Sequence, residues 1–200
     1  MDFYFTIKTN DYAEYKERGS KFLAYSYSIK SPEEFRMQLK KLKKEHPKAV
    51  HHTFAYRIGY DNNNFRASDD GEPSGTAGKQ ILGQIDKRNL TDILVIVVRY
   101  FGGSLLDFPG LGNAYKTAAS LVLQSAQIIQ KPIELKYSIQ FNYTEMNEIM
   151  QILRQYDCRI LKIENQLFCT IETGIPISQD KEVIHSLEII AGAKINRLKE

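Results

Sequence analysis

The sequence has few cysteines, no long apolar segment and no low-complexity segment, and each absence narrows the class of protein. Two cysteines, Cys158 and Cys169, do not make a disulfide framework. We therefore expect reduced thiols and a cytoplasmic location. No run of about eighteen apolar residues exists, so no membrane span is expected. The N-terminus lacks a basic region followed by an apolar core, so we expect no secretory signal.

The net charge of +3 is unevenly distributed along the chain. Residues 1–130 carry 18 basic and 14 acidic side chains, whereas residues 131–200 carry 9 and 10. A mild basic excess favours anionic partners only weakly. It does not reach the strongly basic composition of a dedicated nucleic-acid-binding domain.

The pattern of apolar residues predicts strands and helices in alternation over most of the chain before residue 130. Strands are expected at 3–8, 22–29, 50–60 and 93–98, and helices between Ser31 and His46, at 76–88 and at 111–127. Residues 93–98 are apolar on both faces, which is typical of a central buried strand. We interpret residues 14–21 as a charged link and 61–64 as a turn. This order predicts a layered α+β or α/β domain.

A boundary is predicted at Gln130-Lys131-Pro132, where composition and charge change. Residues 1–130 and 131–200 are therefore expected to form two domains. In the second, strands are predicted at 133–141, 158–163, 166–173 and 193–198, and helices at 143–156 and 178–190. This βαββαβ order is typical of a ferredoxin-like fold. Both cysteines fall on adjacent predicted strands, where we expect them to fill the core.

Two loops hold the densest chemistry, RASDDGEPSGTAGK at 66–79 and RYFGG at 99–103. Neither fits a nucleotide-binding motif. A phosphate-binding loop needs a glycine where Pro73 stands and Ser or Thr where Gln80 stands, and the Gly110-Leu111-Gly112 segment has Tyr115 in place of its third glycine.

The carboxylates of Asp69, Asp70 and Glu72 allow two interpretations. They are hard oxygen ligands suited to Mg²⁺ or Ca²⁺, although their spacing does not fit an EF-hand. Alternatively, they bond nearby backbone amides in a turn. In that case Arg66 or Arg99 could neutralise one of them in a bidentate pair.

The small residues from Ser74 to Gly78 precede a predicted helix, so first-turn amides could hold a phosphate or sulfate, with Lys79 adding charge. The nearby carboxylates oppose this site unless arginines cover them. Nucleophilic catalysis has weaker support, because Ser74 is not in a Gly-x-Ser-x-Gly elbow. His51 and His52 point in opposite directions on one strand, so they do not form a metal pair. We expect His51 to face the site and His52 to be partly buried with its hydrogen bonds satisfied.

Basic side chains crowd one face of the first helix: Arg36, Lys40, Lys41, Lys43 and Lys44. They form either a solvated helix face or a patch for phosphate backbones or an acidic protein. The tetrad Arg18-Gly19-Ser20-Lys21 is similarly either a turn or a turn that contacts an anion.

Several of these segments resemble the IMPACT/YigZ family. They are Ser20-Lys21-Phe22, His51-His52, SDDGEPSGTAGK at 68–79, RYFGG at 99–103 and Ala114-Tyr115, in that family's order. The resemblance implies an N-terminal domain of the ribosomal-protein/elongation-factor-G domain IV type and a C-terminal domain similar to elongation factor G domain V. Eukaryotic relatives regulate translation by competing with a starvation-responsive kinase for its activator protein. For bacterial relatives, fold analogy implies binding to nucleic acid or the ribosome.

The sequence departs from the family after RYFGG. Asp107 and Pro109 occupy places where the family usually has glycine, and Asn113 stands where it often has arginine. These changes predict a weaker anion site and a stiffened loop around Pro109.

We therefore expect a non-catalytic, cytoplasmic two-domain regulator, with no cofactor and no metal, that binds RNA, the ribosome or a translation-related protein. The candidate binding residues are Lys21, His51, Arg66, Ser74, Gly75, Thr76, Gly78, Lys79, Arg99, Gly102 and Gly103, beside the acidic Asp69, Asp70 and Glu72 and the basic helix residues. Two alternatives stay open: a metal- or phosphate-dependent hydrolase that uses the acidic loop, and a protein-interaction module without nucleic acid.

Overall fold

The structure is a computed structural model that describes residues 2–61 and 63–198. It is a mixed α+β protein with two compact units, one of Tyr4–Lys131 and one built mainly from Pro132 onward. In the first unit the elements are β1 (Phe3–Ile7), β2 (Asp11–Glu17), β3 (Ser20–Ser28), α1 (Pro32–Glu45), β4 (His51–Ile58), β5 (Asn64–Ser68), α2 (Gly78–Lys87), β6 (Ile93–Tyr100), α3 (Phe108–Ser125) and β7 (Ile128–Pro132). β1 pairs with β7 in a separate two-stranded sheet.

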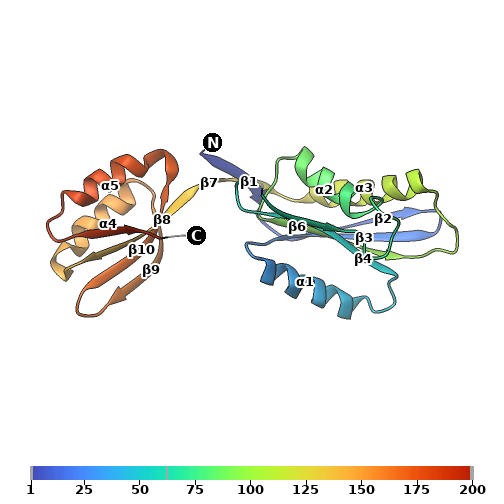
Figure 1. Cartoon of the computed structure of the whole chain (residues 1–200), viewed down its shortest axis with the longest axis horizontal. Coiled ribbons are helices and arrows are strands. Elements are labelled where there is room, and N and C mark those ends of the chain that lie inside the picture. The colour runs from blue at the N-terminus through green and yellow to red at the C-terminus, as the bar shows by residue number, and fades with distance from the viewer. Residues whose placement is uncertain (1, 62, 199–200) are drawn as a thin grey trace. The chain divides into compact units, whose positions relative to one another are not determined.

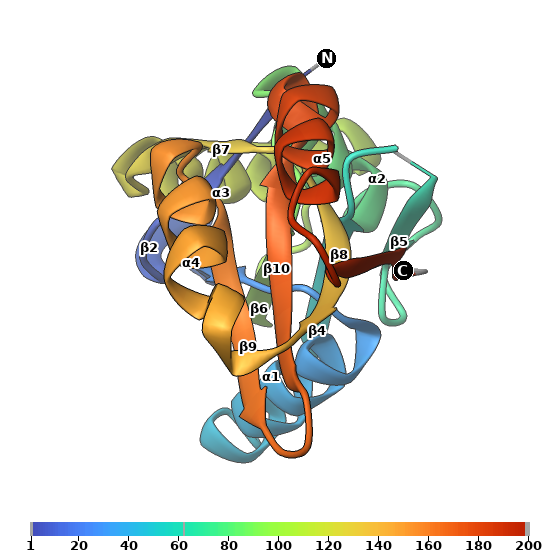
Figure 2. The same ribbon diagram turned by 90° about the vertical axis from the view of Figure 1, so that its left-hand side faces the viewer.

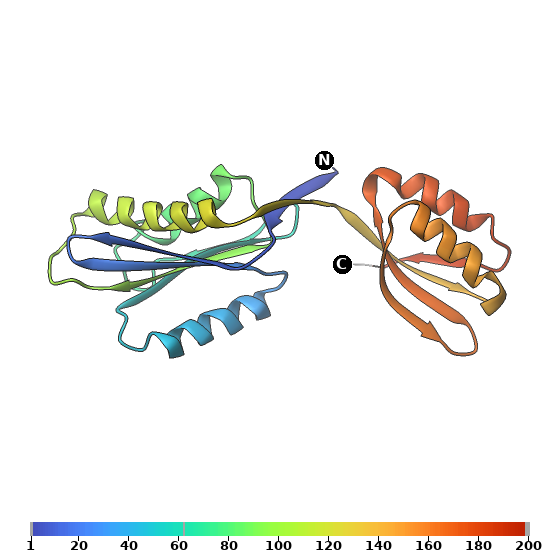
Figure 3. The ribbon, with the colours of Figure 1, turned by 180° about the vertical axis from the view of Figure 1, so that it is seen from behind.

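The main sheet of this unit has five strands in the order β2-β3-β6-β4-β5, and every pairing in it is antiparallel. β6 lies in the middle, and its residues 93–98 are all buried, as the apolar run predicts. Helices α2 and α3 cover one face of the sheet and α1 alone covers the other (Figures 1 and 3).

A separate core lies on each face of this sheet. The core under α2 and α3 includes Phe22, Ala55 and Tyr115, whereas the core under α1 includes Phe54 and Tyr56. Consecutive residues of β4 therefore point to opposite faces, as the alternation from 50 to 60 predicts. The start of α1 is also as expected, because Ser31 Oγ accepts a hydrogen bond from the Glu34 amide at 3.3 Å.

Two strands of this sheet were not predicted. β2 covers part of the expected charged link, and β5 runs from the end of the expected turn at 61–64 into the start of the expected loop at 66–79. Both are edge strands, and β5 is exposed along almost its whole length. Their sequences lack the apolar run or complete alternation that burial imposes on inner strands, so the periodicity does not reveal them.

The second unit contains β8 (Glu134–Phe141), α4 (Met146–Gln155), β9 (Arg159–Asn165), β10 (Cys169–Pro176), α5 (Asp180–Glu188) and β11 (Lys194–Arg197), with short 3-10 turns at Tyr143–Glu145 and Ile177–Gln179. Its antiparallel sheet has the order β11-β8-β10-β9, and β10 lies between β8 and β9 in Figure 2. Cys169 is buried in its core and Cys158 packs against that core, as predicted.

Candidate functional site

The two dense loops meet at one end of the five-stranded sheet. Arg99, near the end of β6, lies opposite His51 on one neighbouring strand and Phe22 on the other. The loop after β5 carries the three acidic residues to the same end, where Tyr115 approaches from α3. Segments that carry the family resemblance, although far apart in the sequence, therefore lie together at this end of the sheet.

Glu72 is the centre of a buried network. The Arg99 guanidinium donates a hydrogen bond from Nη1 to Glu72 Oε1 at 2.7 Å, and the Tyr115 hydroxyl donates to the same oxygen at 2.6 Å. Glu72 is only 8% exposed and Arg99 6%. Arg99 Nη2 also lies 3.5 Å from Ser20 Oγ, which in turn accepts a hydrogen bond from the Gly102 amide. Two distant loops are therefore joined through one ion pair.

This ion pair confirms that an arginine neutralises part of the acidic loop. The residue is Arg99, whereas Arg66 is exposed on β5 and lies over the Phe54 ring, 5.8 Å from its centroid. Desolvation and the bond to the Glu72 carboxylate raise the pKa of Tyr115, so its hydroxyl stays protonated and continues to donate.

His51 faces the acidic loop, as expected. Its Nδ1 lies 2.8 Å from the carbonyl oxygen of Asp70, and since a carbonyl only accepts, Nδ1 carries the proton. Its Nε2 lies 3.6 Å from Glu72 Oε1. His52 points to the α1 side and is 7% exposed, but its Nε2 has no hydrogen-bond partner among the described residues. The prediction of a satisfied His52 therefore holds only in part, because the ring bonds to the Leu42 backbone while Nε2 has no described partner. Burial lowers the pKa of His52.

The anion site expected at the start of α2 is occupied by the chain's own Asp69. Its Oδ1 accepts hydrogen bonds from the Ala77 and Gly78 amides at 3.0 and 2.8 Å, and its Oδ2 accepts from the Gly75 amide at 2.9 Å. These amides are the donors that an external phosphate would need. The prediction of a free anion cradle is corrected accordingly, because an internal carboxylate already bonds to it.

Asp70 lies in the turn after β5. Its backbone has a positive φ of 45°, and its Oδ2 accepts a hydrogen bond from the His52 amide at 2.6 Å. Lys43 of α1 lies 3.7 Å from its Oδ1. The three carboxylates thus have separate internal partners. In residues 2–61 and 63–198 no group of three or more His, Cys, Asp or Glu side chains is arranged to hold a metal ion.

Close backbone contacts explain two of the glycines. A Cβ on Gly102 would lie 1.9 Å from the carbonyl carbon of Gly19. Only glycine at position 102 therefore allows the backbone of the RYFGG segment to pack against the turn at 18–21. A Cβ on Gly78 would lie 2.6 Å from the Ser68 amide nitrogen. Gly19 itself has a φ of +80°, which favours glycine. Gly19, Gly78 and Gly102 therefore allow the backbones of neighbouring loops to pack in direct contact.

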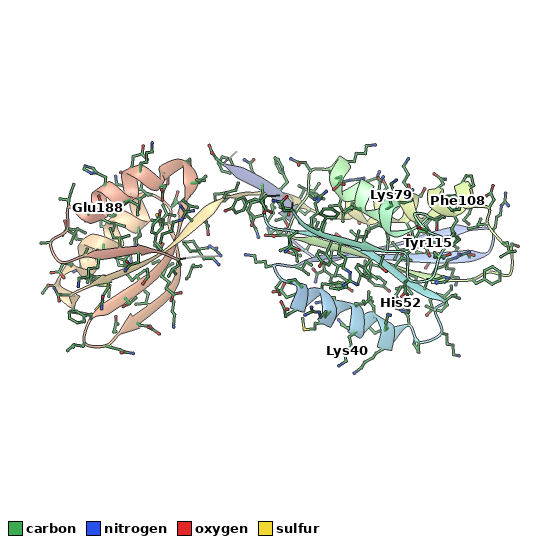
Figure 4. The ribbon with its side chains drawn as sticks, in the orientation of Figure 1. Lys40, His52, Lys79, Phe108, Tyr115 and Glu188 are labelled. Atoms are coloured by element: carbon green, nitrogen blue, oxygen red, sulfur yellow. The ribbon has the colours of Figure 1, made fainter. Side chains whose placement is uncertain are left out.

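The cations predicted at the site are spread over the surface instead of converging. Lys21, Lys40, Lys44 and Lys79 are exposed and form no ion pair with any described residue. Arg36 pairs with Glu33 and Lys41 with Glu45 along α1, and Lys43 reaches Asp70. In Figure 4, Lys40 lies on the α1 side of the sheet, and Lys79 and Phe108 lie on the opposite side.

Of the other candidates, Ser74 and Gly103 are exposed, and Thr76 is buried with its hydroxyl donating to the Pro73 carbonyl oxygen at 2.6 Å. The candidate residues omitted two members of the network, Ser20 and Tyr115. Both stand in segments that carry the family resemblance, and this resemblance is the sequence feature that could have identified them as site residues.

The segment around Pro109 is the start of α3 and not a stiffened loop. Asp107 caps it, because its Oδ1 accepts from the Gly110 amide at 3.2 Å, and Pro109 occupies a first-turn position that suits proline. A hollow of about 260 Å³ lies between the starts of α2 and α3, lined partly by Gln80, Phe108 and Lys116.

Fold and site define a two-unit α+β protein whose most distinctive residues form an internal network. The family model for the Impact N-terminal domain matches residues 18–123, and the chain belongs to the IMPACT family. It is similar to the IMPACT family member YigZ of Escherichia coli, with 32% identity over 84% of this chain and 81% of that protein. YvyE of Bacillus subtilis is 34% identical over 76% of this chain and 70% of its own length.

A crystal structure of a hypothetical protein aligns with all of this chain and 99% of its own, with 27% identity and a TM-score of 0.78. This likeness supports the mixed α+β fold. No helix among the described residues has the length and apolar character needed to span a membrane.

Proposed function

We propose that the chain is a non-catalytic regulator of translation that binds RNA of the translation machinery through exposed cations of the Tyr4–Lys131 unit. One observation carries this proposal: the acidic groups of the motif are bonded internally, whereas several lysines are exposed without a described ion pair. Lysines in that state can neutralise phosphates and release counterions.

The same observation opposes the hydrolase alternative. A metal-dependent hydrolase would need Asp69, Asp70 and Glu72 to converge on one ion. Instead Asp69 bonds backbone amides, Asp70 bonds the His52 amide, and Glu72 bonds Arg99. To bind a metal, each carboxylate would have to leave a partner that is buried or part-buried.

We also propose a fold family for each of the two domains. We assign residues 1–130 to a domain like elongation factor G domain IV, and residues 131–200 to a ferredoxin-like domain like its domain V. The order β8-α4-β9-β10-α5-β11 and the sheet order β11-β8-β10-β9 support the second assignment. A cytoplasmic location, where both free cysteines stay reduced, belongs to the proposal too.

The test measures RNA binding across a salt series with the variant Lys40→Glu/Lys44→Glu. We expect binding at low salt that weakens as salt rises, and a slope against log salt that falls by about one for each lost phosphate contact. The control is Lys181→Glu/Lys194→Glu, which makes the same change in net charge on exposed residues of the second unit. Absence of RNA binding at low salt, or equal effects of both pairs, would contradict the proposal.

A protein-interaction module is the second candidate, and exposed apolar side chains favour it. Leu167 is 90% exposed and Phe168 46%, both in the turn between β9 and β10. Surface side chains of this kind are typical of protein contacts when they cluster. A partner captured by the wild-type chain after nuclease treatment, and lost with Leu167→Ser, would favour this candidate over RNA binding.

A further inference from the structure

One part of the five-stranded sheet is not covered by a helix. On the α1 side, the core under that helix draws on β3, β6 and β4, but on no residue of β2. The register places Tyr12 of β2 beside Tyr25 of β3, and Lys21 of β3 beside Tyr100 of β6. Since alternate residues share a face, Tyr12, Tyr25, Lys21 and Tyr100 all lie on this side.

Four rings form a continuous aromatic surface there, which we call the tyrosine surface: Tyr12, Tyr25, Tyr100 and His46. Ring centroids are 5.1 Å apart for Tyr12 and Tyr25, 5.8 Å for Tyr25 and His46, and 5.9 Å for His46 and Tyr100. Tyr12 is 48% exposed, and the other three are partly exposed.

The rings are held in place by their polar atoms. His46 lies with Nε2 2.8 Å from the Tyr25 hydroxyl and Nδ1 3.0 Å from the Tyr100 hydroxyl. The Tyr12 hydroxyl donates to Glu14 Oε2 at 3.2 Å. Because these bonds fix the hydroxyl groups, little side-chain entropy remains to be lost when a ligand stacks on the surface.

Charge around the tyrosine surface favours an anionic ligand. The exposed cations on the β2–β3 hairpin and on the segment after His46 are Lys16, Arg18, Lys21 and Lys48. The acidic side chains on these segments are Glu14, which pairs with Lys16 at 3.1 Å and is also attracted by Lys21, Glu45, which lies 3.9 Å from Lys41, and Glu17, which accepts a hydrogen bond from the Tyr15 hydroxyl. Arg18, Lys21 and Lys48 have no ion pair with any residue that the structure describes, so they are available to phosphates.

We propose that the tyrosine surface binds single-stranded RNA, whose unpaired bases stack on Tyr12 and its neighbours while Lys21, Arg18 and Lys48 contact phosphates. This inference rests on the proposed function and specifies the form of RNA. Aromatic rings beside cations suit single strands, because the faces of their bases are accessible. In a duplex those faces are stacked within the helix, so the rings would add nothing to phosphate binding.

The test compares three fluorescein-labelled RNA probes of about twelve nucleotides by fluorescence anisotropy at low salt. They are a mixed-sequence single strand, the same strand in a perfect duplex, and an abasic strand with the same backbone. The variants are Tyr12→Leu and Tyr12→Phe, which remove and keep the ring. Tyr143→Leu is the matched control, since Tyr143 is 75% exposed in the second unit.

We expect the wild-type chain to bind the single strand at least about fivefold more tightly than the abasic strand or the duplex. Tyr12→Leu should lose that preference and leave abasic binding unchanged, while Tyr12→Phe and Tyr143→Leu should behave as wild type. Salt-dependent binding that is equal for all three probes would overturn the inference and leave the proposed function standing. No binding of any probe would overturn both. The wild-type comparison of probes needs no variant, so the outcome does not depend on whether Tyr12→Leu folds.

Discussion

Replacement of Glu72 by alanine tests the buried network at its centre. Arg99 is 6% exposed, and its Nε already has no hydrogen-bond partner among the described residues. Without Glu72 it would remain a buried charge with no acidic partner, and Tyr115 would lose its acceptor. Removing one member of a buried pair costs about 3–5 kcal/mol. A domain has roughly 5–15 kcal/mol of stability in total, so this loss is a large fraction.

Urea unfolding followed by far-UV circular dichroism measures the loss, and amide exchange at Val95 and Val97 assigns it to the unit that contains β6. Both residues are completely buried in the central strand, so their exchange requires that unit to open. We expect the midpoint to shift strongly with little change in the slope.

Two companion variants separate the charge from the hydrogen bond. Tyr115→Phe removes one donor to the carboxylate and should cost about 1.5–3 kcal/mol. Glu72→Gln with Arg99→Met removes both charges, and it should recover part of the stability lost in Glu72→Ala, because no unpaired charge stays buried. A loss below about 1 kcal/mol for Glu72→Ala is the size expected of an exposed pair, and it would refute the reasoning.

Three further predictions follow from single residues. Asp69→Ala should lower the free energy of unfolding by about 1–2 kcal/mol. Because the substitution frees the amides at the start of α2, sulfate should raise the melting temperature of this variant and not that of the wild-type protein. Equal effects of sulfate on both proteins would contradict this prediction. Gly102→Ala should lower the free energy of unfolding in urea by about 1–3 kcal/mol, since the new Cβ would overlap the backbone of Gly19. The control Gly83→Ala adds a Cβ in open space and should not destabilise the protein. Partial burial raises the pKa of the Cys158 thiol from 9.0 to about 11, so iodoacetamide should alkylate it slowly at neutral pH. The contribution of the protonated thiol to stability is present below pH 9 and lost as pH rises through 11. Fast alkylation of the native protein at neutral pH would contradict this raised pKa.

The inner elements of the fold could be predicted because burial imposes a period. Residues 93–98 are apolar on both faces as a central strand requires, and β4 alternates between two cores. The edge strands β2 and β5 could not be predicted, because a strand with one neighbour and little burial has weak compositional constraint. Element ends near Pro109 were also missed, since proline and aspartate suit both a loop and the first turn of a helix.

The site was predicted in its residue types and not in its pairings. The turn interpretation of the acidic loop is the one that the contacts of Asp69 support, with amides six to nine residues further along the chain. Sequence spacing could not choose between Arg66 and Arg99 as the partner of Glu72. That choice depends on β5 placing Arg66 on an exposed edge and on β6 placing Arg99 in the interior.

The segment at 66–79 is rich in polar and charged side chains, but most of these side chains bond to other groups of the protein. Two carboxylates that could do chemistry have internal partners: Asp69 accepts hydrogen bonds from backbone amides of its own loop, and Glu72 forms an ion pair with Arg99 of the RYFGG segment. Gly102 packs directly against the backbone of Gly19. On the proposed function, substitutions at these positions should reduce RNA affinity only indirectly, by destabilising the fold. Substitutions at Tyr12 or Lys40, which are exposed, should reduce RNA affinity while stability stays unchanged. Measuring stability and RNA affinity on the same variants therefore distinguishes residues that hold the loops together from residues that contact the ligand.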